Sequence, residues 1–562
     1  MALDPVDDFQ IFVPIIVNLR NSALQLRHWE DIQEKLGSAR IIARGDDFTL
    51  GSLLMLDVLE AADRIQQVSL EATNEANLAE RLEKVQSTWA NEEFIVLRYR
   101  DSRDMYILGS TEEIAQALED SLILVSTVLG SRYVGPIKPE AEAWDRNLRL
   151  FKETLEAWLV CQAQWMYFET IFSNSEIVKQ LYEEEKMFRE VHRSWNAIMR
   201  RVQDGPRCLD AVLEPGMLEQ LRANNRILEQ VQASLESKLE GKRSFFPRFY
   251  FLSNDELLEI LAESKNPAAV QPHLLKCFSN VAALEFSAPE PSGRSSMDIV
   301  ALVSSEGERL VLTRSVKTRS EAVESWLSKV EEAMRSSLKK RGRDALTDYL
   351  AAAKPREQWI FDHCAQLVLA ISQVLWAREV EASLRADNTR NALNRLKEKS
   401  FKQLSALALL VQGELTKLQR KALGSLLTIE VHSRDIVSSL WAAKVADDSA
   451  FLWKKQLRYY WDSEAEELFM EQTNARFEYG YEYLGCSPRL VITPLTDRCY
   501  LTLTGAMALN MGGSPAGPAG TGKTETVKDL AKALAIQCVV FNCSESLEVA
   551  MMGRYFDGPA PS

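Results

Sequence analysis

One short stretch near the C-terminal end of the sequence has the residue types and spacing that bind phosphate. Residues 517–524 read GPAGTGKT and match the pattern G-x-x-x-x-G-K-[ST] at every fixed position. Glycines let the backbone turn tightly, so that successive N–H groups point at a polyphosphate beside the start of a helix. The residues expected to bind the phosphates are Gly517, Pro518, Ala519, Gly520, Thr521, Gly522, Lys523 and Thr524.

The two residues that close this pattern have separate chemical roles. Lys523 is expected to reach the β- and γ-phosphates, and Thr524 is expected to bind Mg²⁺ through its hydroxyl group. A glycine-rich loop that only joins two elements is the alternative, but it gives no reason for a Lys and a Thr to follow the last glycine. The pattern therefore predicts binding of ATP or ADP with Mg²⁺.

The sequence around the loop predicts the elements that must position it. Apolar residues recur at i, i+3, i+4 and i+7 over residues 527–534, which predicts a helix with one apolar face directly after the loop. A strand is expected at residues 538–541 (CVVF). Residues 512–516 (GGSPA) are small, whereas a buried apolar strand usually leads into such a loop, so the match is weaker on that side.

Composition bounds the class of protein. A chain of 562 residues, 46% of them hydrophobic, can form several domains, and its net charge of −14 with a pI near 5.2 does not favour nucleic acid as a partner. No apolar run approaches the roughly 18–20 residues that span a bilayer. The eight cysteines contain no C-x-x-C pair, and the acidic start is unlike a signal peptide. We expect a reducing compartment, with no membrane and no nucleic acid among the partners.

Helical periodicity dominates the sequence before residue 462. Two interruptions are expected to be β-hairpins, at 94–99 with 106–109 and at 299–303 with 310–312, the second entered by a loop at 289–294. Five aromatic residues at helical spacing could stack on bases, but in an acidic chain they favour a packed core. These aromatic residues are Trp158, Trp165, Tyr167, Phe168 and Phe172.

A change of pattern near residue 470 divides the chain into two predicted domains. Residues 477–484 and 489–492 are expected to be extended, and an α/β unit follows them. The predicted domains are therefore a mainly helical region, 1–470, and a nucleotide unit, 471–562. The five histidines lie too far apart in sequence to indicate a metal site.

Residues 489–500 (RLVITPLTDRCY), together with the phosphate loop, closely resemble the first AAA+ module of dynein heavy chains. Further motifs resemble the linker of the same family, and the resemblance covers nearly the whole chain. These motifs lie at residues 27–29 (RHW), 164–172 (QW followed by ETIF), 246–253 (FPRFYFLS), 306–308 (EGE), 431–435 (VHSRD) and 456–461 (QLRYYW).

The resemblance implies a mainly α fold: an elongated multi-helix linker with small β-hairpins, followed by an incomplete α/β P-loop (AAA+) module. In the family the linker lies across a ring of six AAA+ modules and changes shape as the first module turns over ATP, which implies a microtubule motor. The sequences of residues 502–505 and 523–530 resemble those of axonemal heavy chains more than those of cytoplasmic ones. The resemblance therefore implies the cytoskeleton of a cilium or flagellum, with the other ring modules, intermediate and light chains and microtubules as partners.

The resemblance also suggests where the adenine base binds. It should lie against an apolar run with a rigid proline turn, although an ordinary core strand is the alternative for each of these side chains. The residues of this run are Val491, Ile492, Pro494 and Leu495.

The last residues differ from the family pattern. Residues 557–562 (DGPAPS) do not fit it, and we expect the Asp-Glu pair of the catalytic strand to lie further along, so that the chain is a fragment. Glu525, Glu545 and Glu548 do not match the position of that pair. We therefore expect no catalytic residue within the chain, and binding of nucleotide without hydrolysis at a motor's rate.

Two other classes of protein remain open at this point. One is a non-enzymatic helical scaffold with a vestigial nucleotide unit, which predicts the same helices. The other is an unrelated P-loop signalling ATPase with a helical arm, which the linker motifs disfavour.

Overall fold

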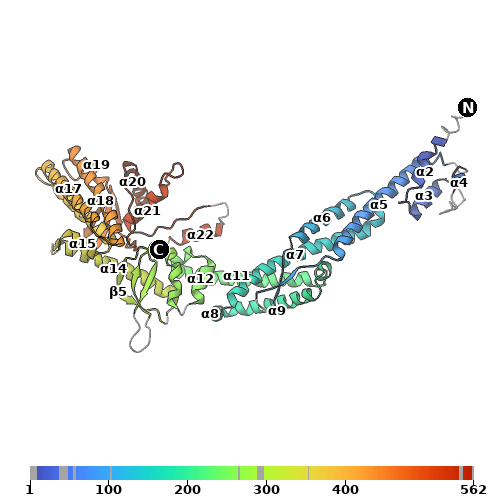
Figure 1. Ribbon diagram of the computed structural model, residues 1–562, viewed down its shortest axis with the longest axis horizontal. Helices are drawn as coiled ribbons and strands as arrows, with labels where there is room; N and C mark the ends of the chain where they lie inside the picture. The colour runs from blue at the N-terminus through green and yellow to red at the C-terminus, as the bar shows by residue number, and fades with distance from the viewer. Residues whose placement is uncertain are drawn as a thin grey trace. The chain divides into compact units, whose positions relative to one another are not determined.

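The computed structural model describes residues 9–36, 49–54, 58–100, 104–263, 266–287, 297–319, 321–351, 354–543 and 549–559 (Figure 1). The chain divides into two compact units, Met1–Leu235 and Glu236–Ser562, and the division falls inside helix α11 (Met217–Phe245). Helices make up most of both units, which confirms the predicted fold class.

The first unit combines helices with one small sheet. Strands β1 (Val96–Arg98) and β2 (Tyr106–Leu108) pair antiparallel, which confirms the first predicted hairpin. The helices of this unit that precede α11 are α2 (Val13–Leu19), α3 (Leu26–Leu36), α4 (Leu50–Leu54), α5 (Ala62–Ala90), α6 (Glu112–Leu129), η1 (Gly135–Ile137), α7 (Lys138–Phe172), α8 (Ser175–Gln180), α9 (Tyr182–Asp204) and α10 (Cys208–Val212).

Aromatic side chains form much of the core of the first unit. Trp165 on α7 stacks on Trp195 of α9, with 5.3 Å between ring centroids. Of the five aromatic residues at helical spacing, Trp158, Trp165 and Phe168 are buried. Phe172 is half-buried, and Tyr167 is 37% exposed. The predicted packing role is therefore confirmed for the three buried rings, whereas Tyr167 lies at the surface.

The second unit carries the phosphate loop. Side-chain caps start several of its helices: Ser253, Thr416 and Thr493 each form a capping box at the N-terminus of the helix that follows. The helices of this unit after α11 are η2 (Pro247–Phe251), α12 (Asn254–Ala262), η3 (Pro267–His273), α13 (Leu274–Cys277), α14 (Val323–Leu350), α15 (Arg356–Asp362), α16 (Ala365–Leu384), α17 (Thr389–Gln412), α18 (Lys417–Ala442), α19 (Phe451–Lys454), α20 (Pro494–Ala508), α21 (Lys523–Leu534) and α22 (Val549–Asp557).

A three-stranded antiparallel sheet contains the second predicted hairpin. Strands β4 (Ile299–Val303) and β5 (Arg309–Val316) pair as expected, and β3 (Ala283–Phe286) adds a third strand on the other side of β4. β3 has only four residues, which is too short for a clear alternating pattern, so the sequence did not indicate it. The loop predicted at 289–294 lies outside the described residues.

A second antiparallel sheet corrects the prediction that helices continue to residue 462. Strand β6 (Arg458–Asp462) pairs with β7 (Glu467–Gln472), which pairs with β8 (Ala475–Glu478). The aromatic run in β6 favours a strand, because large planar side chains pack well on a pleated surface. Residue 470, the predicted domain boundary, lies in the middle strand of this sheet, while the division itself stays a prediction.

Three predicted extended segments do not pair as strands. Residues 479–484, 489–492 and 538–541 have no ladder partner among the described residues, although the first directly follows β8. A strand needs a ladder of hydrogen bonds with a neighbouring strand. Among these described residues, one such bond joins the Tyr479 N–H to the Leu468 oxygen of β7 at 3.0 Å. Val539, Val540 and Phe541 are each more than a third exposed. The prediction of a strand at 538–541 is therefore wrong for this structure.

None of the described helices is both long enough and apolar enough to cross a bilayer.

Candidate nucleotide-binding site

Two residues of the phosphate loop have a backbone conformation that favours glycine. Gly520 and Gly522 have φ values of 76° and 78°, in the left-handed region that other residues adopt only with strain. Gly522 is the N-cap of α21, so the helix begins at Lys523, directly after the turn. The backbone therefore has the form that the sequence pattern predicts, with an exposed helix N-terminus at the end of the loop.

Lys523 lies across the loop that it closes. Its Nζ atom donates hydrogen bonds to the carbonyl oxygen of Gly517, at 2.7 Å, and to that of Pro518. The hydroxyl of Thr521 donates to the same Pro518 oxygen at 2.9 Å, so both side chains face the loop backbone. Thr524 stands beside them in the first turn of α21 and is exposed. The structure thus brings the predicted phosphate-binding residues together around one turn.

A buried carboxylate on α21, which the sequence did not indicate, holds the chain segment before α20. Asp529 accepts two hydrogen bonds from Arg489, at 2.9 and 3.0 Å, and one from the backbone N–H of Leu490 at 2.9 Å. Tyr500 on α20 donates a fourth, at 2.5 Å. In the sequence, the signal for this contact is limited to the position of Asp529 beside the apolar face of its helix and of Arg489 directly before an apolar run.

The ionisation of this cluster follows from its partners. Burial alone would raise the pKa of the Asp529 carboxyl, but the Arg489 guanidinium and the hydrogen bonds hold it below its ordinary value. The pKa of the Tyr500 hydroxyl is raised by burial and by the neighbouring Asp529 charge. The cluster is therefore a charged Arg–Asp pair with a neutral tyrosine as donor.

The segment predicted to bind adenine is a loop that leads into α20. Val491 and Leu495 are 68% and 71% exposed, Ile492 is half-buried, and Pro494 is the first residue of α20. The alternative of an ordinary core strand does not hold here, because the segment is not a strand and its side chains are not in the core. Exposed apolar side chains next to the phosphate-loop helix suit a planar ring, and their role in binding stays a prediction.

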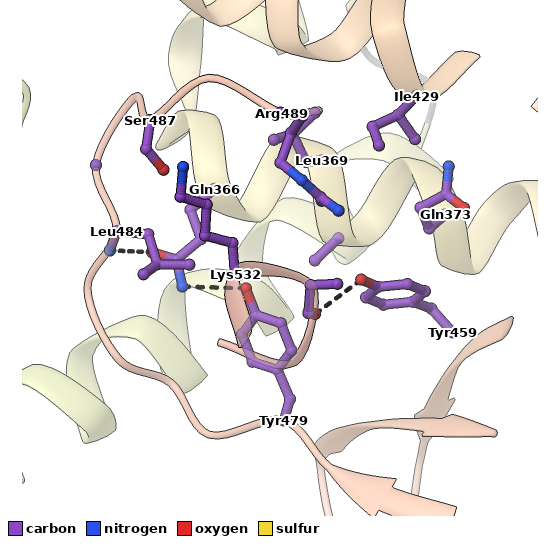
Figure 2. A pocket seen from close by; sticks show the side chains of 13 residues that line it. Gln366, Leu369, Gln373, Ile429, Tyr459, Tyr479, Leu484, Ser487, Arg489 and Lys532 are labelled. Atoms are coloured by element: carbon purple, nitrogen blue, oxygen red, sulfur yellow. Dashed lines mark hydrogen bonds between the residues drawn. The ribbon is translucent and has the colours of Figure 1, made fainter. Parts of the chain in front are cut away.

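The C-terminal end of α21 is bound by backbone and side-chain donors from earlier in the chain. The backbone N–H groups of Gly480 and Glu482 donate to the carbonyl oxygens of Leu534 and Ala535 at 3.0 and 2.9 Å. Tyr459 on β6 donates to the oxygen of Ala533 at 2.8 Å (Figure 2). These donors satisfy carbonyl groups that a helix end otherwise leaves unpaired.

Residues 479–486, here called the strap, follow β8 and lead to the loop before α20. All of them except the half-buried Gly480 are buried. Gln366 on α16 donates to the Tyr479 hydroxyl at 3.0 Å and accepts from the Leu484 N–H at 2.9 Å (Figure 2). It also donates to the backbone carbonyl oxygen of Glu482 at 2.8 Å. A cavity of about 20 Å³ beside these contacts has room for about one water molecule. Arg489 lines the same cavity, so the strap leads directly to the Asp529 cluster.

A buried ion pair fixes the middle of the strap. Arg248 of η2 donates to both carboxylate oxygens of Glu482, at 3.0 and 2.8 Å, and their side chains are 1% and 2% exposed. Arg248 also pairs with Glu331 on α14 at 3.0 Å, and the Ser279 N–H donates to Glu482 at 2.9 Å. The strap is therefore bonded on one side to α21 and on the other to helices that precede it.

The strap passes so close to the end of α21 that Gly480 tolerates no side chain. A Cβ atom there would lie 2.5 Å from the Ala535 oxygen and 2.8 Å from a side-chain carbon of Ile536. We expect Gly480→Ala to lower the free energy of local opening of the strap by about 1–3 kcal/mol, the usual cost of overpacking. Hydrogen exchange of the Gly480 and Glu482 amides measures it.

Gly424→Ala is the matched control for this prediction. Gly424 is exposed within α18, and a Cβ atom there meets nothing within 4 Å. Alanine should stabilise that helix by about 0.5–1 kcal/mol. Strap amides that exchange equally slowly in wild type and Gly480→Ala would contradict the close packing.

Metal ligands and cysteine thiols are other side chains that can carry chemistry. No group of three or more His, Cys, Asp or Glu side chains there could hold a metal ion. All eight cysteines are free, and burial raises the pKa of the Cys161, Cys208 and Cys277 thiols to about 12, so these thiols are not reactive nucleophiles near neutral pH.

A loop with glycines in the left-handed region at the start of a helix, and a lysine across that loop, define a P-loop nucleotide-binding protein. Residues 2–345 match the family model "Dynein heavy chain, N-terminal region 2", and residues 479–562 match "Hydrolytic ATP binding site of dynein motor region". The chain belongs to the dynein heavy chain family. It therefore carries a dynein-type nucleotide-binding region, as the resemblance of its motifs predicts.

Curated relatives align along almost the whole chain. It is 48% identical to dynein axonemal heavy chain 6 of Homo sapiens over 98% of its length, 42% identical to dynein axonemal heavy chain 2 of Mus musculus over 99%, and 42% identical to dynein axonemal heavy chain 1 of Homo sapiens over 99%. These alignments cover 14%, 12% and 13% of the respective relatives, so the chain spans about one eighth to one seventh of their length. The expected similarity to axonemal heavy chains is confirmed.

Proposed function

We propose that this chain is part of an ATP-driven microtubule motor of the axoneme. Residues 471–562 form the N-terminal part of its first AAA+ module and bind ATP or ADP, and residues 1–470 form its linker. The observation that carries the proposal is the phosphate loop itself, with Gly520 and Gly522 in the left-handed region and Lys523 at the start of α21. Membership of the dynein heavy chain family supplies the motor context.

In this proposal the loop binds and orients the nucleotide. The backbone N–H groups at the start of α21 face the phosphates, and Lys523 exchanges its loop carbonyl partners for phosphate oxygens. The Thr524 hydroxyl is exposed beside Lys523 and is a hard oxygen ligand of the kind that Mg²⁺ accepts together with phosphate oxygens. Bound Mg²⁺ supplies charge neutralisation at the β- and γ-phosphates.

No carboxylate is assigned as a catalytic residue. Glu525 lies on α21 and pairs with Lys528 at 2.9 Å, so its carboxylate is engaged on the helix that carries the loop. Glu545 and Glu548 lie outside the described residues. The proposal for these 562 residues is therefore nucleotide binding, coupled to the linker.

The contacts of α21 suggest how nucleotide binding acts on the linker. The N-terminus of this helix is at the phosphate loop, and its last carbonyl groups accept hydrogen bonds from the strap. Glu482 of the strap pairs in turn with Arg248, which contacts α14 through Glu331. A displacement of α21 on binding would therefore be passed to linker helices through bonded groups rather than through solvent.

Partners and location follow from the family in this proposal. The motor would contain the remaining ring modules, intermediate and light chains, and would move on microtubules in the cytoskeleton of a cilium or flagellum. The second candidate function, a helical scaffold with a vestigial nucleotide unit, shares all of these helices. It differs in one measurable property, because a vestigial unit binds no nucleotide.

Calorimetric titration of the 562-residue chain with Mg·ATP and Mg·ADP separates the two functions. Saturable binding of one nucleotide per chain supports the motor assignment. Heat no greater than that of dilution, from a chain whose circular dichroism shows its helices intact, favours the scaffold.

The adenine segment is tested by Leu495→Asp. Leu495 is 71% exposed, so the substitution leaves the core intact, but it replaces an apolar side chain with a charged one where the base is proposed to bind. A leucine covered by a ligand contributes about 1.5–3 kcal/mol, so we expect ATP affinity to fall about tenfold or more. Leu509→Asp, at the other end of α20 and 68% exposed, is the control and should bind ATP normally. Equal affinities for both variants would place the base elsewhere.

A further inference from the structure

Asp529 fastens both ends of the apolar segment at residues 490–495 to the phosphate-loop helix. Before the segment, it accepts hydrogen bonds from Arg489 and from the Leu490 N–H. After the segment, it accepts one from Tyr500, two turns into α20. One carboxylate thus anchors the loop at its entry and its exit.

The same carboxylate lies at a fixed distance from the phosphate loop. Asp529 and Lys523 are six residues apart on α21, which is about 9 Å along the axis of one rigid helix. The segment that offers exposed Val491 and Leu495 is therefore held at a set spacing from the loop. ATP has a similar constraint, because its base and its phosphates are joined by one ribose.

Stability alone does not account for this cluster. The Arg489 and Asp529 side chains are 9% and 3% exposed. The free energy needed to remove two charges from water offsets much of the attraction between them. Apolar side chains of similar size would hold the helix in place about equally well. The fork of two parallel N–H···O bonds instead fixes direction as well as distance.

We propose that Asp529, Arg489 and Tyr500 are positioning residues that set the spacing between the phosphate loop and the base-binding segment. They determine how much the adenine base adds to affinity, and they do not contact the phosphates. This inference rests on the proposed function, since it assumes that nucleotide binds at the loop. Its consequence is selective. Loosening the cluster lowers the affinity for ligands that contain a base and leaves the affinity for ligands that contain only phosphates unchanged.

The experiment compares Mg·ATP with magnesium tripolyphosphate, which has the phosphate chain and no base, on the 562-residue protein. Arg489→Lys keeps the positive charge and loses the two-bond fork. We expect its ATP affinity to fall about tenfold, which is about 1.4 kcal/mol, while tripolyphosphate affinity changes less than about twofold. Arg343→Lys is the matched control, because Arg343 pairs with Glu466 at the surface, at 2.8 Å, and should leave both affinities unchanged.

A second variant keeps the test valid if Arg489→Lys fails to fold, which circular dichroism reports. Tyr500→Phe removes one donor to Asp529 and keeps the ring, and should weaken ATP alone by about threefold, as expected for the loss of one hydrogen bond. Unchanged ATP affinity in the folded variants overturns the inference. Equal losses for both ligands overturn it too, because the cluster would then only support the fold.

The wild-type protein separates this inference from the proposed function. The positioning role requires ATP to bind more tightly than tripolyphosphate, whereas the proposed function requires only that the nucleotide binds at the loop. Equal affinity for the two ligands means that the base contributes nothing, which overturns the positioning role and leaves phosphate binding standing. Binding of neither ligand overturns the proposed function, and the inference with it.

Discussion

Lys523→Ala is expected to weaken binding of ATP and ADP by about tenfold or more. The Lys523 ammonium already lies over the loop, bonded to the Gly517 and Pro518 carbonyl oxygens, and is therefore placed to neutralise phosphate charge. A charge-assisted hydrogen bond contributes about 1.5–3 kcal/mol, and alanine cannot replace it. Calorimetric titration with Mg·ATP measures the loss.

Lys528→Ala is the matched control for this experiment. Lys528 is on the same helix, little more than one turn further on, and pairs with Glu525 instead of facing the loop. Its removal changes the net charge by the same amount and should alter ATP affinity little. Identical affinities for wild type, Lys523→Ala and Lys528→Ala would mean that the nucleotide binds away from this loop.

Arg248→Met is expected to lower the free energy of local opening of the strap by about 3–5 kcal/mol, the usual cost of leaving one partner of a buried ion pair uncompensated. The Glu482 carboxyl group, 2% exposed, would lose its Arg248 partner and retain the hydrogen bond from the Ser279 N–H. Hydrogen exchange of the Gly480, Glu482 and Leu484 amides reports the opening.

The double variant Arg248→Met/Glu482→Gln shows whether charge is the cause. It leaves no unpaired carboxylate, so its strap should be more stable than that of Arg248→Met alone. Arg343→Met, which breaks a surface pair with Glu466, should cost about 1 kcal/mol or less. A double variant that opens as readily as Arg248→Met would mean that lost packing, and not the buried charge, destabilises the strap.

Patterns with a local physical cause could be predicted from the sequence. The phosphate loop and α21 follow from glycine conformations and helical spacing, and the hairpin β1–β2 and the pair β4–β5 follow from short apolar runs around polar turns. The strand predicted at 538–541 failed for a non-local reason: a strand depends on its neighbours, and no described segment pairs with those residues.

The residues that organise the site could not be predicted because their partners are far apart in sequence. Arg248 and Glu482 are 234 residues apart, and Arg489 and Asp529 are 40 apart. Each is a common surface residue type, and nothing local distinguishes a charge that will be buried. The apolar segment could be placed only by resemblance, since spacing alone did not separate an exposed loop from a core strand.

The burial of the strap also bears on how such a protein can be recombined. Modules that evolution exchanges between proteins are usually joined by exposed polar linkers with few contacts. Here the strap at residues 479–486, directly after the predicted boundary near residue 470, is mostly buried, and its groups bond to η2 and α16 on one side and to α21 on the other. A chimaera cut in the strap would separate Glu482 from Arg248 or from α21. We therefore expect the linker and the nucleotide region to be inherited as one unit, with changes on one side matched by changes on the other.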